Sequence, residues 1–170
     1  MSRTVEEFIA KVFSMSDAVW ERHANPLSVW TRYSVLPILV IAFWSRIWLG
    51  WWSVMCVVAA LGWTWINPRL FRKPKSTNNW ASKAVLGERV WLNRKEVPVP
   101  ECHRILPNIL SIVASLGMVL CIYGVVRLHV WPTLFGIAST YMGKSWFLDR
   151  MVWLYEDMKD THPEYRKWLY

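Results

Sequence analysis

Four apolar runs dominate the pattern of this chain, and they cover residues 30–49, 51–66, 107–126 and 128–148. A helix needs about 20 residues to cross the hydrocarbon core of a membrane, so three runs are long enough and the second is slightly short. The links inside each pair are little more than Gly50 and residues 126–129. The pattern therefore predicts an all-α polytopic membrane protein, one domain over 1–170, with four transmembrane helices in two hairpins.

Two further stretches have the spacing of amphipathic helices. In 4–20 apolar residues recur at helical spacing, and Thr4 with Glu7 matches a capping box. Asn79 is a suitable cap for a second helix, within the basic segment 67–106. We expect both helices to lie at the membrane interface. The last run is expected to continue as a C-terminal helix within 149–170.

The charges predict the orientation. The chain carries 20 Lys and Arg against 12 Asp and Glu, a net charge of +8. Nine of these cations lie in 67–106, while the two tight turns have only Arg46 and Arg127. The positive-inside rule then gives a multi-pass protein of the cell (inner) membrane, with both termini cytoplasmic and no cleaved signal. Its expected partners are the bilayer and anionic lipids at the cytoplasmic face.

The chain is rich in tryptophan, with 14 residues, and these fit two interfacial belts. The outer belt would contain Trp44, Trp48, Trp51, Trp52 and Trp131, and the inner belt Trp30, Trp63, Trp65, Trp146 and Trp153. A ligand cage built from tryptophan is the alternative. Three separated cysteines, Cys56, Cys102 and Cys121, indicate no disulfide framework.

Polar residues gather at the predicted inner ends of the helices. Lys144, Asp149 and Arg150 follow the last apolar run, and an Asn-Pro pair stands at each of two corners, in WERHANP and WINPRLF. Ionisable groups at membrane depth tend to mark functional sites, although snorkelling and helix capping explain the same residues. Candidates for proton transfer are His23, Glu88 and Asp149. Candidates for ligand contact are Asn25, Arg32, Asn67, Arg69, Arg89, Lys144, Arg150 and Glu156.

Metal and nucleic-acid sites have little support. His23, His103 and His162 are weak metal candidates, because no pair has the spacing of a helical metal site. No cofactor is assigned, no Ser or Cys stands in a nucleophile elbow, and the basic segment lacks a nucleic-acid recognition element.

Small residues on the last two runs predict close helix packing. Ser111, Ser115, Gly136, Thr140 and Gly143 are spaced to let helices approach. That contact would lie within one chain or in an oligomer, either a homo-oligomer or a complex with another membrane subunit.

With the motifs WERHANP, NPRLF, LGER and KSWFLDRMVWLYEDM, the chain resembles a family of small, uncharacterised prokaryotic integral membrane proteins. The resemblance supports the membrane architecture and supplies no catalytic residue. Three functions fit the pattern. The first is binding or processing of a lipid-like or anionic small molecule at the cytoplasmic face. The others are a non-catalytic interaction or membrane-shaping subunit, and a small transporter.

Overall fold

The computed structural model describes residues 16–170, and every regular element in that part of the chain is helical. The elements are α2 (Asp17–His23), α3 (Pro26–Arg32), α4 (Val35–Trp44), α5 (Arg46–Leu49), the 3-10 turn η1 (Gly50–Trp52), α6 (Ser53–Leu70), α7 (Trp80–Leu92), the 3-10 turn η2 (Glu101–His103), α8 (Ile105–Arg127), α9 (Val130–Met158) and α10 (Pro163–Lys167). The amphipathic helix expected over 4–20 lies largely outside the described residues.

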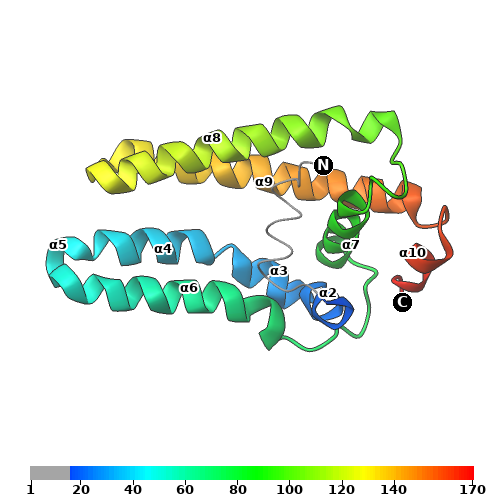
Figure 1. Cartoon of the computed structure of the whole chain (residues 1–170), viewed down its shortest axis with the longest axis horizontal. Coiled ribbons are helices and arrows are strands. Elements are labelled where there is room, and N and C mark those ends of the chain that lie inside the picture. The colour runs from blue at the N-terminus through cyan, green and yellow to red at the C-terminus, as the bar shows by residue number, and fades with distance from the viewer. Residues whose placement is uncertain (1–15) are drawn as a thin grey trace.

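Two antiparallel hairpins run side by side (Figure 1). The first hairpin contains α4 and α6, and the second contains α8 and α9. Each turns where the sequence predicted, at a residue with a positive φ: Gly50 has φ +52° and Leu128 has φ +57°. Glycine adopts this conformation without strain, whereas a leucine at that φ is unusual.

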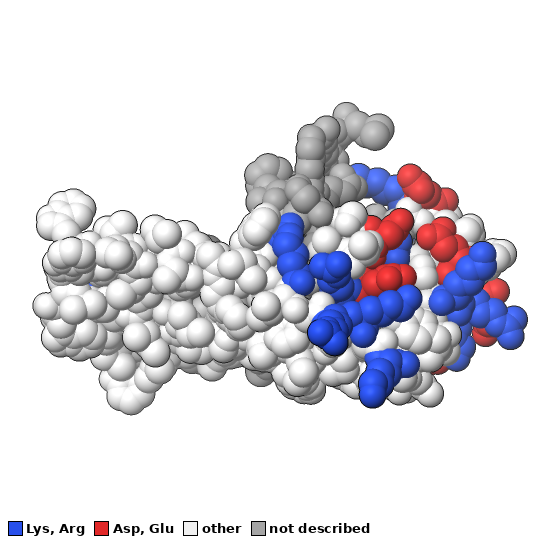
Figure 2. All heavy atoms as spheres, turned by 90° about the horizontal axis from the view of Figure 1, so that it is seen from below, with Lys and Arg blue, Asp and Glu red and all other residues white. Residues whose placement is uncertain are grey.

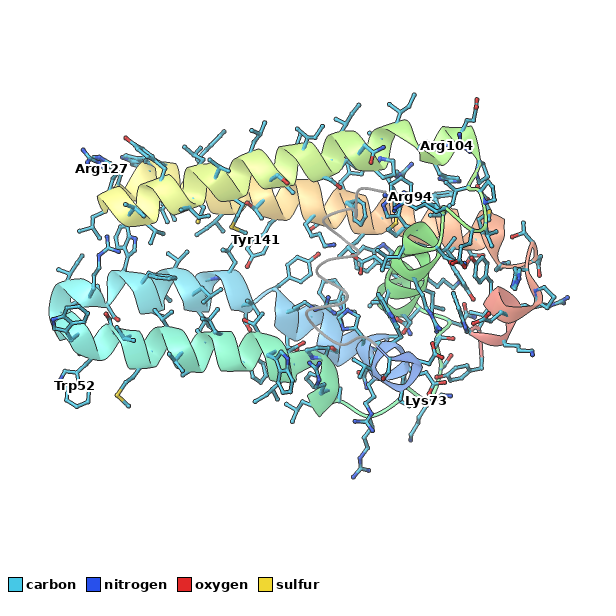
Figure 3. The ribbon with its side chains drawn as sticks, in the orientation of Figure 1. Trp52, Lys73, Arg94, Arg104, Arg127 and Tyr141 are labelled. Carbon is cyan, nitrogen blue, oxygen red and sulfur yellow. The ribbon has the colours of Figure 1, made fainter. Side chains whose placement is uncertain are left out.

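The first apolar run differs from its prediction, because 30–49 is divided among α3, α4 and α5. Pro37 explains the first break. A proline inside a helix has no N–H to donate and its ring clashes with the carbonyl four residues earlier, here that of Tyr33. The chain breaks at that point, between α3 and α4, and the Tyr33 carbonyl accepts a hydrogen bond from the Tyr141 hydroxyl instead. Figure 3 shows Tyr141 pointing from α9 toward the first hairpin.

Glycines bring α8 and α9 into close contact within one chain. A Cβ atom added at Gly136 would lie 2.4 Å from the backbone nitrogen of Cys121, and one at Gly143 would lie 2.9 Å from that of Ala114. The prediction of close packing is confirmed for these two positions. The side chains of Ser111 and Ser115 do not hydrogen-bond to α9. Their hydroxyls donate to carbonyls of α8 itself, those of Pro107 and Ser111.

The expected cap of α7 is present, since Asn79 Oδ1 accepts from the backbone N–H of Ser82 at 2.9 Å. The helix α7 is more buried than its amphipathic pattern indicated. Eight of its thirteen residues are buried, and Gly87 lies against the backbone of Met151 on α9. The helix is therefore a core element that packs across α9.

The main core lies around α7, the last turns of α9 and α10. Its fully buried members are Ala84, Val90, Met151, Leu154 and Tyr155. By contrast α4 buries only Ala42, and α6 buries Ser53, Ala60, Asn67 and Pro68. Most large apolar side chains of the hairpins therefore face outward.

Charge divides the molecule into two parts. Residues 35–66 and 105–143 form the apolar part, in which Arg46 and Arg127 are the only Lys, Arg, Asp or Glu. Figure 2 shows the charged side chains gathered over the other end of the molecule, the charged part, which contains α2, α7 and α10. Within residues 16–170 two helical stretches, 26–70 and 101–127, are long and apolar enough to cross a membrane, and the first of them contains the whole first hairpin.

The two hairpins are joined at the far tip of the apolar part. Arg46 reaches from α5 and donates from Nη2 to the carbonyls of Val125 and Val126, each at 2.8 Å. Those carbonyls belong to the last turn of α8, which ends at Arg127, and the Val125 carbonyl also accepts from the backbone N–H of Leu128 at 3.4 Å. Arg127 and Trp52 mark this end of the molecule in Figure 3.

Candidate functional site

Side chains from four helices meet where α3 ends against α7 and α9. They are His23 of α2, Arg32 of α3, Glu88 of α7 and Lys144 of α9, and we call this group the Arg32 site. The sequence predicted these four residues as candidates, and the fold brings them together from positions up to 121 residues apart in the chain (144 − 23).

Arg32 is the last residue of α3, where a cation interacts favourably with the helix dipole. Its Nη2 lies 2.8 Å from Nδ1 of His23. Its Nε is buried and has no hydrogen-bond partner among the described residues 16–170. Burying an unpaired N–H of a charged group is costly, so this guanidinium retains unused capacity to bind an anion.

The hydrogen bond to Arg32 fixes the tautomer of His23. A guanidinium only donates, so Nδ1 of His23 must accept, and the proton of the neutral imidazole is on Nε2. His23 is only 6% exposed. Burial, together with the positive charges of Arg32 and Lys144, holds the pKa of His23 well below its ordinary range. The imidazole is therefore neutral at neutral pH.

Glu88 and Lys144 complete the site as an ion pair, with Lys144 Nζ 2.5 Å from Glu88 Oε1. The lysine side chain is 46% exposed and its Nζ also lies over the ring of Phe147. An ion pair this open contributes little to stability, on the order of 1 kcal/mol or less. Glu88 is also close enough to act electrostatically on Arg32. The four side chains thus carry two positive charges and one negative charge.

An aromatic wall adjoins the site. The rings of Trp30 and Trp80 stack with centroids 5.7 Å apart, and the ring of Tyr33 lies 5.5 Å from that of Tyr141. The Tyr33 hydroxyl lies 3.0 Å from the hydroxyl of Ser145. Tyr33, Tyr141 and Ser145 were not predicted from the sequence as neighbours of the site. The sequence did contain one signal of this arrangement: Tyr141, Ser145 and Asp149 are spaced by four residues, so they lie on one face of a helix.

Asp149 and Arg150 lie beside this wall and do not join Lys144. Trp80 donates from Nε1 to Asp149 Oδ1 at 3.2 Å, and Arg150 pairs with Asp149 Oδ2 at 2.8 Å. The hydrogen bond from Arg150, then that from Trp80, lowers the pKa of Asp149 against the effect of burial. An ionised, paired Asp149 is a poor proton acceptor, which weakens its candidacy for proton transfer.

The two Asn-Pro segments, Asn25-Pro26 and Asn67-Pro68, lie close together, and their hydrogen bonds hold the surrounding helices in place. Asn67 is fully buried, accepts from Ser28 Oγ at 3.3 Å and donates to Thr31 Oγ1 at 2.8 Å. Asn25 caps α3 and donates from Nδ2 to the Arg72 carbonyl at 2.8 Å. These bonds position the helix that carries Arg32.

The remaining ligand candidates lie in other contacts. Arg69 lies over the ring of Trp65 and donates to its carbonyl. Arg89 pairs with Asp17 and lies 4.1 Å over the ring of Trp168.

Glu156 pairs with both Lys83 and Lys159, each at 2.6 Å. The hydrogen bonds from Lys159 and then Lys83 lower the pKa of Glu156. This ion-pair network joins α7 to the end of α9.

The three histidines proposed as metal ligands are apart. His23 contacts Arg32, His103 Nε2 lies 2.7 Å from Asp157 Oδ2, and His162 Nδ1 accepts from the backbone N–H of Glu164. In residues 16–170 no group of three or more His, Cys, Asp or Glu side chains is arranged to hold a metal ion.

Comparison with known proteins gives a family and no activity. Neither a curated protein nor a solved structure matches the chain. A family model described as "Family of unknown function (DUF6653)" matches residues 4–168, nearly the whole chain. The chain therefore belongs to DUF6653, a family of unknown function, in agreement with the resemblance to an uncharacterised family.

Proposed function

We propose that the protein spans a membrane with both hairpins and binds an oxyanion, the phosphodiester of an anionic lipid headgroup, at the Arg32 site. The hairpins supply four crossings: α4 with α5, α6, α8 and the first part of α9. The charged part, both termini included, then lies on the cytoplasmic side of the cell membrane, where the positive-inside rule puts it.

Exposure of the apolar part supports the membrane crossing. Trp51 is 90% exposed and Trp131 is 79% exposed, both next to a hairpin turn. Such side chains are stable at the headgroup level of a bilayer, and the outward apolar faces of α4, α6 and α8 are stable in its hydrocarbon core. A soluble protein would bury these faces.

The topology can be tested with the native cysteine Cys102, which is exposed and lies in the basic segment. We expect a membrane-impermeant maleimide to label Cys102 only after the cells are opened. Cys121, buried in the second hairpin, is expected to stay unlabelled in the folded protein.

A second cysteine serves as the opposite reporter. His129→Cys, in a Cys102→Ser background, places a thiol at the exposed turn between α8 and α9, and intact cells should label it. Labelling of Cys102 from outside, or of both positions from one side, would disprove the proposed orientation.

One observation carries the binding proposal. Among residues 16–170 the buried Nε of Arg32 has no hydrogen-bond partner, and its Nη2 lies against a neutral imidazole. Guanidinium groups bind phosphate oxygens in pairs, along one edge. Lys144 adds a half-exposed second cation, and the exposed Trp30 and Trp146 provide the amphipathic surface that lies beside lipid headgroups.

The binding test compares Arg32→Gln with Arg127→Gln, which removes the same charge from the exposed end of α8. Binding is measured by native mass spectrometry of protein in neutral detergent, titrated with phosphatidylglycerol or with inorganic sulfate. Loss of a charged hydrogen-bonding partner costs about 1.5–3 kcal/mol, so we expect Arg32→Gln to weaken binding roughly tenfold to a hundredfold. Arg127→Gln should bind like the unchanged protein.

The two probes distinguish the sources of the anion. Binding of phosphatidylglycerol without sulfate binding means that the lipid is the ligand, whereas equal dependence on Arg32 for both means a general oxyanion site. If neither probe binds, or both variants bind equally, the site is not an anion site. An interaction subunit or a transporter of another solute would then explain the chain better.

A further inference from the structure

We infer that His23 takes up a proton when the anion binds, so that the affinity of the Arg32 site rises as the pH falls. This inference rests on the proposed function, and it names how the same site is regulated. The proton comes from solvent and no covalent bond other than N–H is formed.

The planar guanidinium of Arg32 has one edge that suits an oxyanion. Nε and Nη2 of an arginine lie on the same edge of its planar group, and this is the edge that takes two oxygens of one anion. In Arg32, Nη2 is directed to Nδ1 of His23, while Nε has no partner. His23 therefore occupies half of the edge that the anion needs.

Protonation of His23 frees that edge. Once Nδ1 carries a proton it can only donate, as Arg32 does, so the contact between the two residues becomes a repulsion. An oxyanion resolves the repulsion, because it accepts from Nε and Nη2 of Arg32 and from Nδ1 of the imidazolium together. Anion and proton therefore stabilise each other in the site.

The charges around His23 explain why the proton is absent before the anion arrives. Arg32 of α3 and Lys144 of α9 both face the imidazole with positive charge, and burial adds to their effect. Glu88 of α7 supplies one negative charge, and it is paired with Lys144. On α2 itself, Glu21 is turned to Lys73, and on α6 Arg69 lies over Trp65. The anion adds the negative charge that an imidazolium at this position requires.

Proton linkage gives the direction in which the affinity for the anion changes with pH. The bound form holds more protons than the free form between the lowered pKa of free His23 and its higher pKa in the complex, so affinity increases as pH falls through that window. A single linked proton changes affinity at most about tenfold per pH unit. Phosphatidylglycerol and sulfate suit this test, because their own charge is constant across the range.

The experiment repeats the titration with both probes at about pH 7.5 and about pH 5.5, on either side of the ordinary histidine pKa. We expect the unchanged protein to bind about 5- to 50-fold more tightly at the lower pH. His23→Asn keeps an acceptor near the position of Nδ1 but does not titrate, so its affinity should be independent of pH. His162→Asn, which keeps a capping side chain at the start of α10, should retain the dependence.

A second measurement covers the case in which His23→Asn does not fold. Imidazole NMR signals of the unchanged protein, which has four histidines, report the protonation of each ring with and without the probe. We expect the pKa of one buried histidine to rise on binding. If the probe binds with equal affinity at both pH values and no histidine pKa rises, the inference is wrong while the anion site stands. If the probe does not bind at either pH, the proposed function itself fails.

Discussion

Gly87→Ala should lower the thermal unfolding midpoint of the protein more than the same change at any other glycine. A Cβ at position 87 would lie 1.9 Å from the carbonyl oxygen of Met151 and 2.5 Å from its carbonyl carbon. Both are backbone atoms of α9, which no side-chain rotation can move. Separating α7 from α9 is the remaining response, and we expect the free energy of unfolding to fall by about 3 kcal/mol or more.

Gly62→Ala is the matched control, since it adds the same methyl group to α6 where, apart from the neighbouring residues and backbone of α6 itself, no atom lies within 4 Å. Alanine has the higher helix propensity by about 1 kcal/mol, so this variant should be as stable as the unchanged protein or more stable. Thermal unfolding followed by circular dichroism in neutral detergent measures both. Equal midpoints for the two variants would show that α7 does not cross α9 at Gly87.

Asn67→Leu should be the second strongly destabilising change. Leucine has a similar volume, but it removes the acceptor for Ser28 and the donor to Thr31 in a fully buried position. The Ser28 hydroxyl, itself fully buried, would lose this partner. Unsatisfied buried groups cost about 1–3 kcal/mol each, and we expect a total of about 2–4 kcal/mol. Because Asn67 holds α3 in place, anion binding at Arg32 should weaken as well.

Asn108→Leu provides the comparison for this change. Asn108 is exposed on α8 and donates only to the Arg104 carbonyl one turn earlier. Its replacement should change stability by about 0.5 kcal/mol or less, as is usual for surface positions. A midpoint for Asn67→Leu as high as that for Asn108→Leu would mean that the two Asn-Pro corners do not support each other.

Local signals were sufficient for much of the fold. Run length and the tight links around Gly50 and Leu128 predicted two hairpins, and Asn79 predicted the start of α7. The break between α3 and α4 also had a local signal in Pro37, but an apolar run is read as one helix when only hydrophobicity is counted. A proline inside an apolar run marks a possible break without deciding it, since α6 continues through Pro68.

The candidate site shows where local signals end. His23, Arg32, Glu88 and Lys144 were each recognisable as polar residues at one depth, because charge next to an apolar run is a property of the sequence. The pairing of Lys144 with Glu88 could not be recognised from the sequence. The two residues are 56 positions apart and meet only because α7 packs across α9. The burial of α7 was missed for the same reason: alanine, serine and glycine look weakly amphipathic in sequence, yet they are what a close crossing requires.

Arg46 has a consequence for the order in which the chain is assembled. Its guanidinium donates to two carbonyls at the end of α8, and in the proposed membrane topology the carbonyl of Val126 needs this donor because no water reaches the hydrocarbon core. Arg46 leaves the ribosome about 80 residues before Val126, so the donor is in place before its acceptors are synthesised. In the proposed membrane topology the first hairpin therefore presents a hydrogen-bond donor to the end of α8 as soon as the second hairpin is inserted.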